Sequence, residues 1–283
     1  MRRYHRLLPL LLAAVLLLAG ACARAEEPVQ ALFINVGKAD AALFLLGDER
    51  FLVDTGTKDS YDQLERVLTA YGVTQLSGVV ITHTDKDHVG GLKKLLKSDI
   101  AVDRVYAGTL HSEKSLEDHP VYEAAEKYGA PLTWLSAGET VEAADGCAFH
   151  VLGPLSRDEE EENNNSLVLR LTTPQGDMLL TGDMELAEES ELIAAGLISQ
   201  AAVLKVAHHG NEDATGWQFA LLARPQWAVI STSSVEKPET PSSKVLSRLK
   251  DVKASVAVTQ DAEVGILVTL RDGQASAEAV NWR

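Results

Sequence analysis

The segment 82–91 constrains what this chain of 283 residues can fold into more than any other feature. It holds two histidines and two aspartates within six consecutive positions, directly after an apolar run at residues 76–81. Such a run is typical of a buried strand, so the polar side chains extend from the loop at its carboxyl end. Open α/β sheets carry their ligand sites at that edge, and Gly90 and Gly91 allow a tight turn into a following helix.

The residue types in this segment predict a metal site. Imidazole nitrogens and carboxylate oxygens are the protein ligands of divalent zinc, manganese or iron. A solvated polar loop is the alternative, and the density of ligand groups directly after a strand argues against it. The side chains concerned are those of His83, Asp85, Asp87 and His88.

The rest of the chain alternates β-rich runs with helical patterns, and no linker or low-complexity segment divides it. Because these elements alternate in two similar halves, we expect a single domain of two packed sheets with helices outside. Apolar spacing predicts helices at 60–71, 91–97, 115–128, 185–195, 217–223 and 242–249. Strands are predicted at 29–36, 41–46, 50–54, 76–81, 102–106, 167–171, 178–181, 202–206, 227–231, 255–259 and 265–271.

Residues 1–25 have the pattern of a bacterial export signal, with three arginines before an apolar run at residues 7–18. A lipobox-like sequence would leave Cys22 as a lipidated N-terminus, whereas an A-x-A site at 23–25 would release a soluble chain. An uncleaved anchor is disfavoured because the run is shorter than the ~20 residues of a membrane span. We expect an exported mature domain at 26–283, either a cell-surface lipoprotein held to the membrane only through Cys22 or a secreted protein.

The charge balance argues against tight binding to duplex nucleic acid. The chain has 26 basic and 41 acidic residues and a formal charge of −15. Removal of residues 1–25 takes away four arginines and no acid, which moves the charge to −19. Phosphate backbones are bound by lysine and arginine, which such a surface presents sparsely. The acidic run 158–162 is expected to be a solvated loop, and Cys147 a buried strand residue rather than a nucleophile.

Further ligand-type residues lie near other strand ends. Asp54 follows an apolar run, where a metal ligand and a carboxylate that orients a ligand histidine are both open interpretations. Asp183 lies in a Thr-Gly-Asp sequence, which alone is more often a helix cap, and a carboxylate there could bridge two metal ions about 3.5–4 Å apart. His208 and His209 follow a third predicted strand, and the segment 163–166 lies at the entry to a fourth. Each alone has an ordinary explanation, such as a helix N-cap. The remaining histidines of the mature chain are expected to be surface or packing residues: His111, His119 and His150.

Together these segments resemble the metallo-β-lactamase superfamily, most closely the branch with the hydrolase domain of the DNA-uptake protein ComEC. That branch has T-H-x-D-x-D-H-x-G-G where typical members have H-x-H-x-D-H, so Asp85 stands in place of a histidine. It also shares L-K-V-x-H-H-G, matched at 204–210, and N-x-x-S-L-V-L, matched at 163–169. The resemblance covers roughly residues 28–272 and implies a four-layer αββα sandwich, an α/β fold with two mixed β-sheets and helices outside.

The resemblance also implies two divalent metal ions, zinc or manganese. Asn165 and Ser166 stand where other members supply a third histidine to the first ion, which leaves that site rich in oxygen and favours manganese or weakly held zinc. The first ion would be held by His83, Asp85 and the bridging Asp183, and the second by Asp87, His88, Asp183 and His208.

The implied reaction is hydrolysis by a water molecule that the two ions activate, with no serine or cysteine nucleophile. In this scheme Asp87 also accepts a proton, Asp183 bridges the ions, and His209 contacts the substrate or supports a ligand. Asp40 and Asp54 are expected to support the ligands or to meet the substrate.

Three departures from the branch's motifs bear on substrate handling. The branch motif V-G-Q-G-D corresponds to residues 36–40 of this chain, where Lys38 stands in place of the glutamine. In the later branch motif G-H-P-S the histidine would meet the substrate, and this chain has Thr240 at that position. In the branch motif H-H-G-S the serine is replaced by Asn211. We predict an exported phosphodiesterase acting on small nucleotide-like molecules or single-stranded nucleic acid. The alternatives are a hydrolase of another ester, thioester or amide, and a catalytically impaired metal-binding module.

Overall fold

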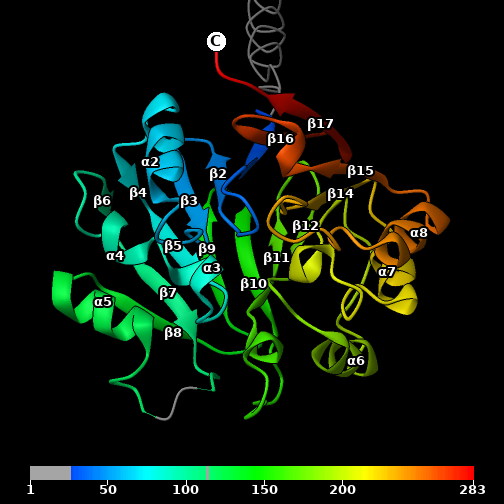
Figure 1. Cartoon of the computed structure of the whole chain (residues 1–283), viewed down its shortest axis with the longest axis horizontal. Coiled ribbons are helices and arrows are strands. Elements are labelled where there is room, and N and C mark those ends of the chain that lie inside the picture. Colours follow the sequence, from blue (N-terminus) through cyan, green and yellow to red (C-terminus); the bar gives the residue numbers. More distant parts are fainter. Residues whose placement is uncertain (1–26, 113–114) are drawn as a thin grey trace, which may run out of the picture.

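Long apolar stretches pair into two facing β-sheets in the computed structural model, which describes residues 27–112 and 115–283 (Figure 1). In spatial order the first sheet contains β17 (Gln274–Val280), β16 (Gly265–Arg271), β1 (Val29–Ile34), β2 (Ala42–Leu46), β3 (Glu49–Val53), β5 (Gly78–Ile81), β7 (Val105–Gly108) and β8 (Leu132–Leu135). The second contains β15 (Ser255–Val258), β14 (Trp227–Ile230), β13 (Val203–Lys205), β12 (Met178–Leu180), β11 (Val168–Thr172), β10 (Cys147–Gly153) and β9 (Thr140–Ala144). A short pair joins β4 (Gln75–Leu76) to β6 (Ala101–Val102).

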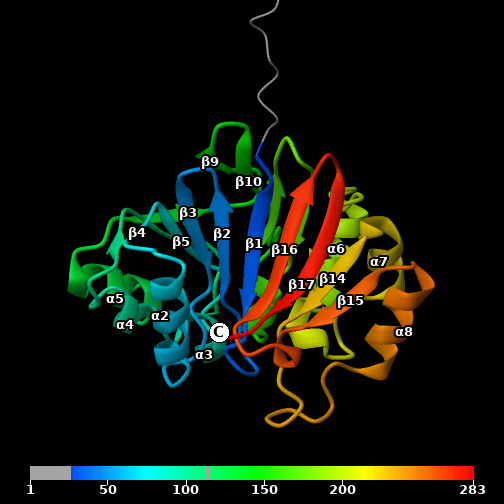
Figure 2. The same ribbon diagram turned by 90° about the horizontal axis from the view of Figure 1, so that it is seen from above.

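Helices cover the outer face of each sheet, which gives four layers (Figures 1 and 2). On the first sheet lie α2 (Tyr61–Ala70), α4 (Leu92–Leu95) and α5 (Pro120–Tyr128). On the second lie α6 (Leu186–Ala194), α7 (Trp217–Ala223) and α8 (Ser243–Asp251). The inner faces meet in an apolar core in which the Phe44 and Phe149 rings pack edge to face at 5.5 Å. The predicted αββα sandwich with two mixed sheets is therefore confirmed.

Both sheets are mixed, and this arrangement positions the polar loops. In the first sheet β3, β5, β7 and β8 run parallel, and in the second β12, β13, β14 and β15 do so. Parallel strands end at the same edge of a sheet, so the loops that follow β3, β5, β12 and β13 gather there. These loops begin at Asp54, Thr82, Thr181 and Val206.

The structure adds elements that the sequence patterns did not predict. A single helical turn, α3 (Lys86–Val89), forms inside the segment 82–91, with Asp85 at its N-cap position. The predicted helix 115–128 begins only at Pro120, because His119 caps it and proline suits its first position. Cys147 is buried in β10, as expected.

The predicted export signal, Cys22 included, lies outside the described residues, so export stays a prediction. Within residues 27–112 and 115–283, no helix combines the length and apolar character needed to cross a membrane.

Candidate metal centre

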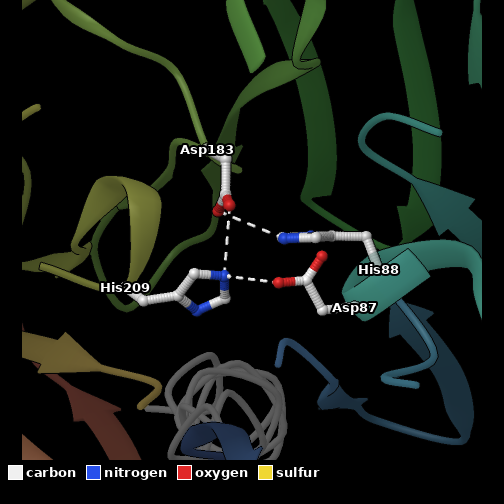
Figure 3. Close-up of side chains that lie close together, drawn as sticks. All are labelled: Asp87, His88, Asp183 and His209. Atoms are coloured by element: carbon white, nitrogen blue, oxygen red, sulfur yellow. Dashed lines mark ion pairs between the residues drawn. The ribbon is translucent and has the colours of Figure 1, made fainter. Parts of the chain in front are cut away.

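Four side chains from both sheets meet at the edge where these loops gather (Figure 3). Asp87 and His88 come from α3, Asp183 follows β12, and His209 follows β13. The Nε2 atom of His88 lies 3.2 Å from Asp183 Oδ1, and His209 Nε2 lies 3.1 Å from Asp183 Oδ2. His209 Nε2 is also 3.4 Å from Asp87 Oδ2. Each of the four offers a ligand atom within 4.8 Å of the others, a spacing that suits one shared metal ion.

The buried atoms of this cluster fit a metal ion. Among the described residues, His88 Nε2, His209 Nε2 and Asp183 Oδ1 are buried and make no hydrogen bond, although ionic partners lie close. His83 Nε2 is buried without a hydrogen bond as well. Buried polar atoms are nearly always satisfied, because leaving one unpaired costs roughly 1–3 kcal/mol. A divalent cation would satisfy several of them at once.

The predicted ligands of the first ion form a looser group. The His83 ring lies 4.1 Å from that of His88, centroid to centroid, and its Nε2 is 3.9 Å from Asp85 Oδ2. The Asp85 side chain is 52% exposed, so it reaches the cluster from the solvent side. Burial and the neighbouring Asp87 raise the pKa of Asp85. The structure brings His83 and Asp85 beside the four-residue cluster rather than into it.

Asp54 holds the His88 imidazole in place through the ring nitrogen that faces away from Asp183. Its Oδ2 lies 2.8 Å from His88 Nδ1, and its two oxygens accept from the backbone N–H and the hydroxyl of Thr82 at 2.8 and 2.9 Å. The residue sits at φ 61°, a left-handed conformation that disfavours any side chain but is tolerated by aspartate. Of the two interpretations left open for Asp54, the geometry favours the carboxylate that orients a ligand histidine.

His208, which the resemblance assigned as a metal ligand, lies away from the cluster, and His209 takes its position. The three consecutive residues from His208 to Gly210 all have positive φ, at 47°, 54° and 77°. This tight left-handed turn sends the two imidazoles in different directions. His208 Nδ1 instead lies 3.0 Å from Asp213 Oδ1 and 3.5 Å from Glu185 Oε1. Left-handed backbone costs about 1–2 kcal/mol for each ordinary residue, so the turn is kept by its surroundings.

Asn165 and Ser166 support the site instead of facing an ion. The Ser166 hydroxyl accepts from the backbone N–H of Asp183 at 3.1 Å and so fixes the start of that segment. The Asn165 side chain accepts from the N–H of Asp158 and donates to the Asp158 carbonyl and to Glu162. Thr240 is buried, with its hydroxyl 2.6 Å from that of Thr232.

Glu162 corrects the expectation that the whole acidic run 158–162 is a solvated loop. Its Oε1 accepts from the N–H and hydroxyl of Thr84 at 3.2 and 2.8 Å. Its Oε2 accepts from the N–H of Ser112 at 2.6 Å. Residues 159–161 are exposed as predicted, whereas Glu162 ties this loop to the segment that carries His83.

The charges of the cluster shift pKa values in opposite directions. Burial alone would raise the pKa of Asp183, but the imidazoles of His209 and His88 hold it well below its usual range. Burial would lower the pKa of His88, yet the carboxylates of Asp183 and Asp54 raise it well above its usual value. The pKa of His209 is raised too, because Asp183 outweighs its burial. Since metals bind neutral imidazole, metal binding here must displace protons.

Two lysines belong to this centre although ligand-type residues alone did not point to them. Lys205 is buried, pairs with Asp40 Oδ2 and lies 3.4 Å from the Gly182 carbonyl. Asp40 Oδ1 lies 3.8 Å from His209 Nδ1, so this predicted site residue sits behind the imidazoles and not where a substrate would enter. Lys38 Nζ donates to Asp87 Oδ2 at 2.6 Å. In the sequence, only the match to L-K-V-x-H-H-G pointed to Lys205. Only the replacement of glutamine in the V-G-Q-G-D motif pointed to Lys38.

This chain is similar to known proteins in sequence and in fold. The family model described as the metallo-beta-lactamase superfamily matches residues 34–232. ComE operon protein 3 of Bacillus subtilis is 32% identical over 247 residues, covering 81% of this chain and 31% of that protein. Competence protein ComA of Neisseria gonorrhoeae is 29% identical over 246 residues, covering 84% of this chain and 32% of that protein. The solved metallo-beta-lactamase fold protein YhfI from Bacillus subtilis gives a TM-score of 0.56 at 13% identity, covering 89% of this chain and 100% of that one. The chain thus spans about a third of the length of the curated relatives it matches.

Proposed function

This chain belongs to the metallo-β-lactamase superfamily, in its ComEC-like branch, and on that premise we propose that it is a metal-dependent phosphodiesterase. The observation that carries the proposal is the placement of Asp183 between two imidazoles whose Nε2 atoms are buried without hydrogen bonds. A carboxylate in this position suits the bridge between two divalent ions.

The donor set favours zinc or manganese. Asp87, His88, Asp183 and His209 would hold one ion, and His83, Asp85 and Asp183 the other. When bound, the ions would supply an activated water and neutralise charge on the attacked group. The residues of the chain keep the ligands in place, through Asp54 on His88 and Ser166 on Asp183.

Asp87 suits the role of a ligand better than that of a proton acceptor. Burial alone would raise the pKa of Asp87, but the nearby imidazoles of His209 and His88 lower it strongly. A carboxylate that stays ionised so firmly is a poor base near neutral pH. This assignment replaces the proton-transfer role that the resemblance implied for Asp87.

The relatives and the charge of the chain both bear on the substrate. Two relatives carry names that refer to competence or to its operon, which supports nucleic acid or a nucleotide-like molecule as substrate. The charge of −15 favours single strands or small molecules over a duplex. A β-lactam is disfavoured because Asn165 and Ser166 offer the first ion no third imidazole.

The test is an assay of the purified chain, loaded with manganese or zinc, against bis-p-nitrophenyl phosphate, single-stranded DNA and nitrocefin. We expect turnover of the phosphodiesters and none of nitrocefin, and loss of turnover in Asp183→Asn. Absence of all turnover from metal-loaded protein contradicts the phosphodiesterase and leaves a metal-binding module. Phosphodiester cleavage that persists in Asp183→Asn contradicts the site.

A further inference from the structure

Lys38 lies at the solvent side of the metal centre. It belongs to the loop between β1 and β2, and its Nζ donates to Asp87 Oδ2 at 2.6 Å. The Lys38 side chain is 24% exposed and that of Asp87 is 18% exposed, whereas the His88 and His209 side chains are fully buried. The ammonium group is therefore within reach of a molecule that approaches the centre from solvent.

The Lys38 ammonium retains capacity to bind a ligand. It has three N–H donors, and within the described part of the chain only Asp87 accepts a hydrogen bond from it. Lys205, the other lysine of the centre, differs because its side chain is 6% exposed and is held by Asp40 and the Gly182 carbonyl. A lysine ammonium group is cationic at neutral pH, so Lys38 offers a positive charge to an anionic ligand.

The loop around Lys38 is fixed at several points. The Lys38 N–H donates to Glu236 Oε2 at 3.3 Å, and the Gly37 N–H donates to Asn35 Oδ1 at 3.3 Å. The Asp40 N–H donates to the Asp87 carbonyl at 3.0 Å. Gly37 has φ +83° and packs against the Glu236 carboxylate so closely that a Cβ would overlap it. Such anchoring places the ammonium before any ligand arrives, which favours binding.

A second departure from the branch motif lies on the adjoining segment. Thr240, where a histidine would meet the substrate, is 2% exposed, and its hydroxyl donates to the Lys237 carbonyl at 3.0 Å. Glu236 links this segment to the Lys38 loop. The position that lost a histidine thus faces inward, while the position that gained a lysine offers a cation to the solvent side.

We propose that Lys38 binds a non-bridging oxygen of the substrate's phosphate group and thereby selects anionic phosphoesters over neutral esters. The inference rests on the proposed function and names the group that recognises its substrate. An ammonium group suits a phosphate oxygen as a point charge, and this contact replaces the one that a histidine at position 240 would make.

The test compares Lys38→Gln, which restores the residue of the branch motif, with Lys38→Arg, which keeps the charge. Lys93→Gln is the matched control, because Lys93 is an exposed lysine on α4 that pairs with Glu123. Three quantities are measured on each purified, manganese-loaded chain: the KM for bis-p-nitrophenyl phosphate, the dissociation constant of inorganic phosphate, and the manganese affinity by calorimetry.

We expect Lys38→Gln to raise both the KM and the phosphate dissociation constant about 10-fold, as loss of one charged hydrogen bond does, with manganese affinity retained. Lys38→Arg keeps most of the binding, and Lys93→Gln changes nothing. Tighter manganese binding in Lys38→Gln with unchanged KM and phosphate affinity overturns the proposal, because Lys38 then only neutralises Asp87. If the wild-type chain cleaves no diester, the proposed function fails, and the phosphate arm alone decides: equal or undetectable phosphate binding by wild type and Lys38→Gln overturns the role of Lys38.

Discussion

His209 and Asp183 approach each other from loops that follow neighbouring parallel strands, and their contact decides which histidine of the pair binds metal. We expect His209→Ala to weaken zinc or manganese binding about 100-fold or more, since it removes a ligand rather than a supporting group. His208→Ala should leave metal affinity within a few-fold, because its imidazole pairs with Asp213. Calorimetric titration of both variants measures this directly. Retained binding in His209→Ala together with loss in His208→Ala would restore the assignment drawn from the resemblance.

The same pair shows how far residue types alone reach. Histidine and aspartate after a strand point to ligands because few other roles need them at such density, as at His83 and His88. For two adjacent histidines, the residue type does not tell which imidazole points into the site. That direction depends on the backbone angles, which are left-handed at both residues here. A search for metal ligands does not find Lys38, because lysine is not a ligand type. Its role depends on its contact with Asp87, 49 positions further along the chain.

At the scale of elements, two of the strands that were not predicted have weak burial or a short apolar pattern. β17 alternates exposed and half-buried residues along its whole length at the end of the first sheet. β8 is four residues long and mostly half-buried. Their apolar content is too low or too brief to stand out, and hydrogen bonding to a preceding strand forms them. The strands that position the candidate site, β5, β12 and β13, are fully buried and were predicted.

The contact between α6 and the start of α7 should make stability depend on pH. Glu189 on α6 accepts from the Gly216 N–H at 2.9 and 3.1 Å, and burial raises its pKa from 4.5 to about 7. The pKa of Glu189 is higher in the folded than in the unfolded chain. Its contribution to the free energy of unfolding is therefore fully present below pH 4.5 and is lost as pH rises through about 7. On the order of 1–3 kcal/mol of unfolding free energy should disappear over this window.

Glu189→Gln should remove this part of the decline, because its amide cannot ionise and still offers an acceptor to Gly216. Denaturant unfolding at pH 5 and pH 8 measures the effect as a difference between variant and wild type. Glu126→Gln, an exposed glutamate on α5, is the control. Glu188, whose pKa burial also raises, remains in both proteins and so cancels from the comparison. An identical decline in Glu189→Gln and wild type would show that Glu189 is not the source.

At the scale of the whole molecule, the candidate metal centre joins the two sheets. Asp54, Asp87 and His88 belong to segments of the first sheet, whereas Asp183 and His209 follow strands of the second. The aromatic core contact between Phe44 and Phe149 joins the sheets at their inner faces. The layered order followed from the alternation of strands and helices together with the family resemblance. The resemblance also implied that loops from both halves share one centre, and the packed structure shows which side chains meet there.

A cation bound at this junction should stabilise the entire fold rather than one half. At a free manganese concentration about 100 times the dissociation constant, binding adds about 2.7 kcal/mol to the free energy of unfolding. For a chain of this size that corresponds to a rise in Tm of about 5–10 °C. Thermal unfolding followed by circular dichroism, with manganese and then with excess chelator, measures the shift and its reversal.

The net charge of −15 could draw cations to the surface in general, so Asp183→Asn is the deciding control. It keeps nearly all of the surface charge but removes the bridging carboxylate, and we expect its Tm to respond little to manganese. An equal shift in Asp183→Asn would mean that the stabilising ions bind elsewhere.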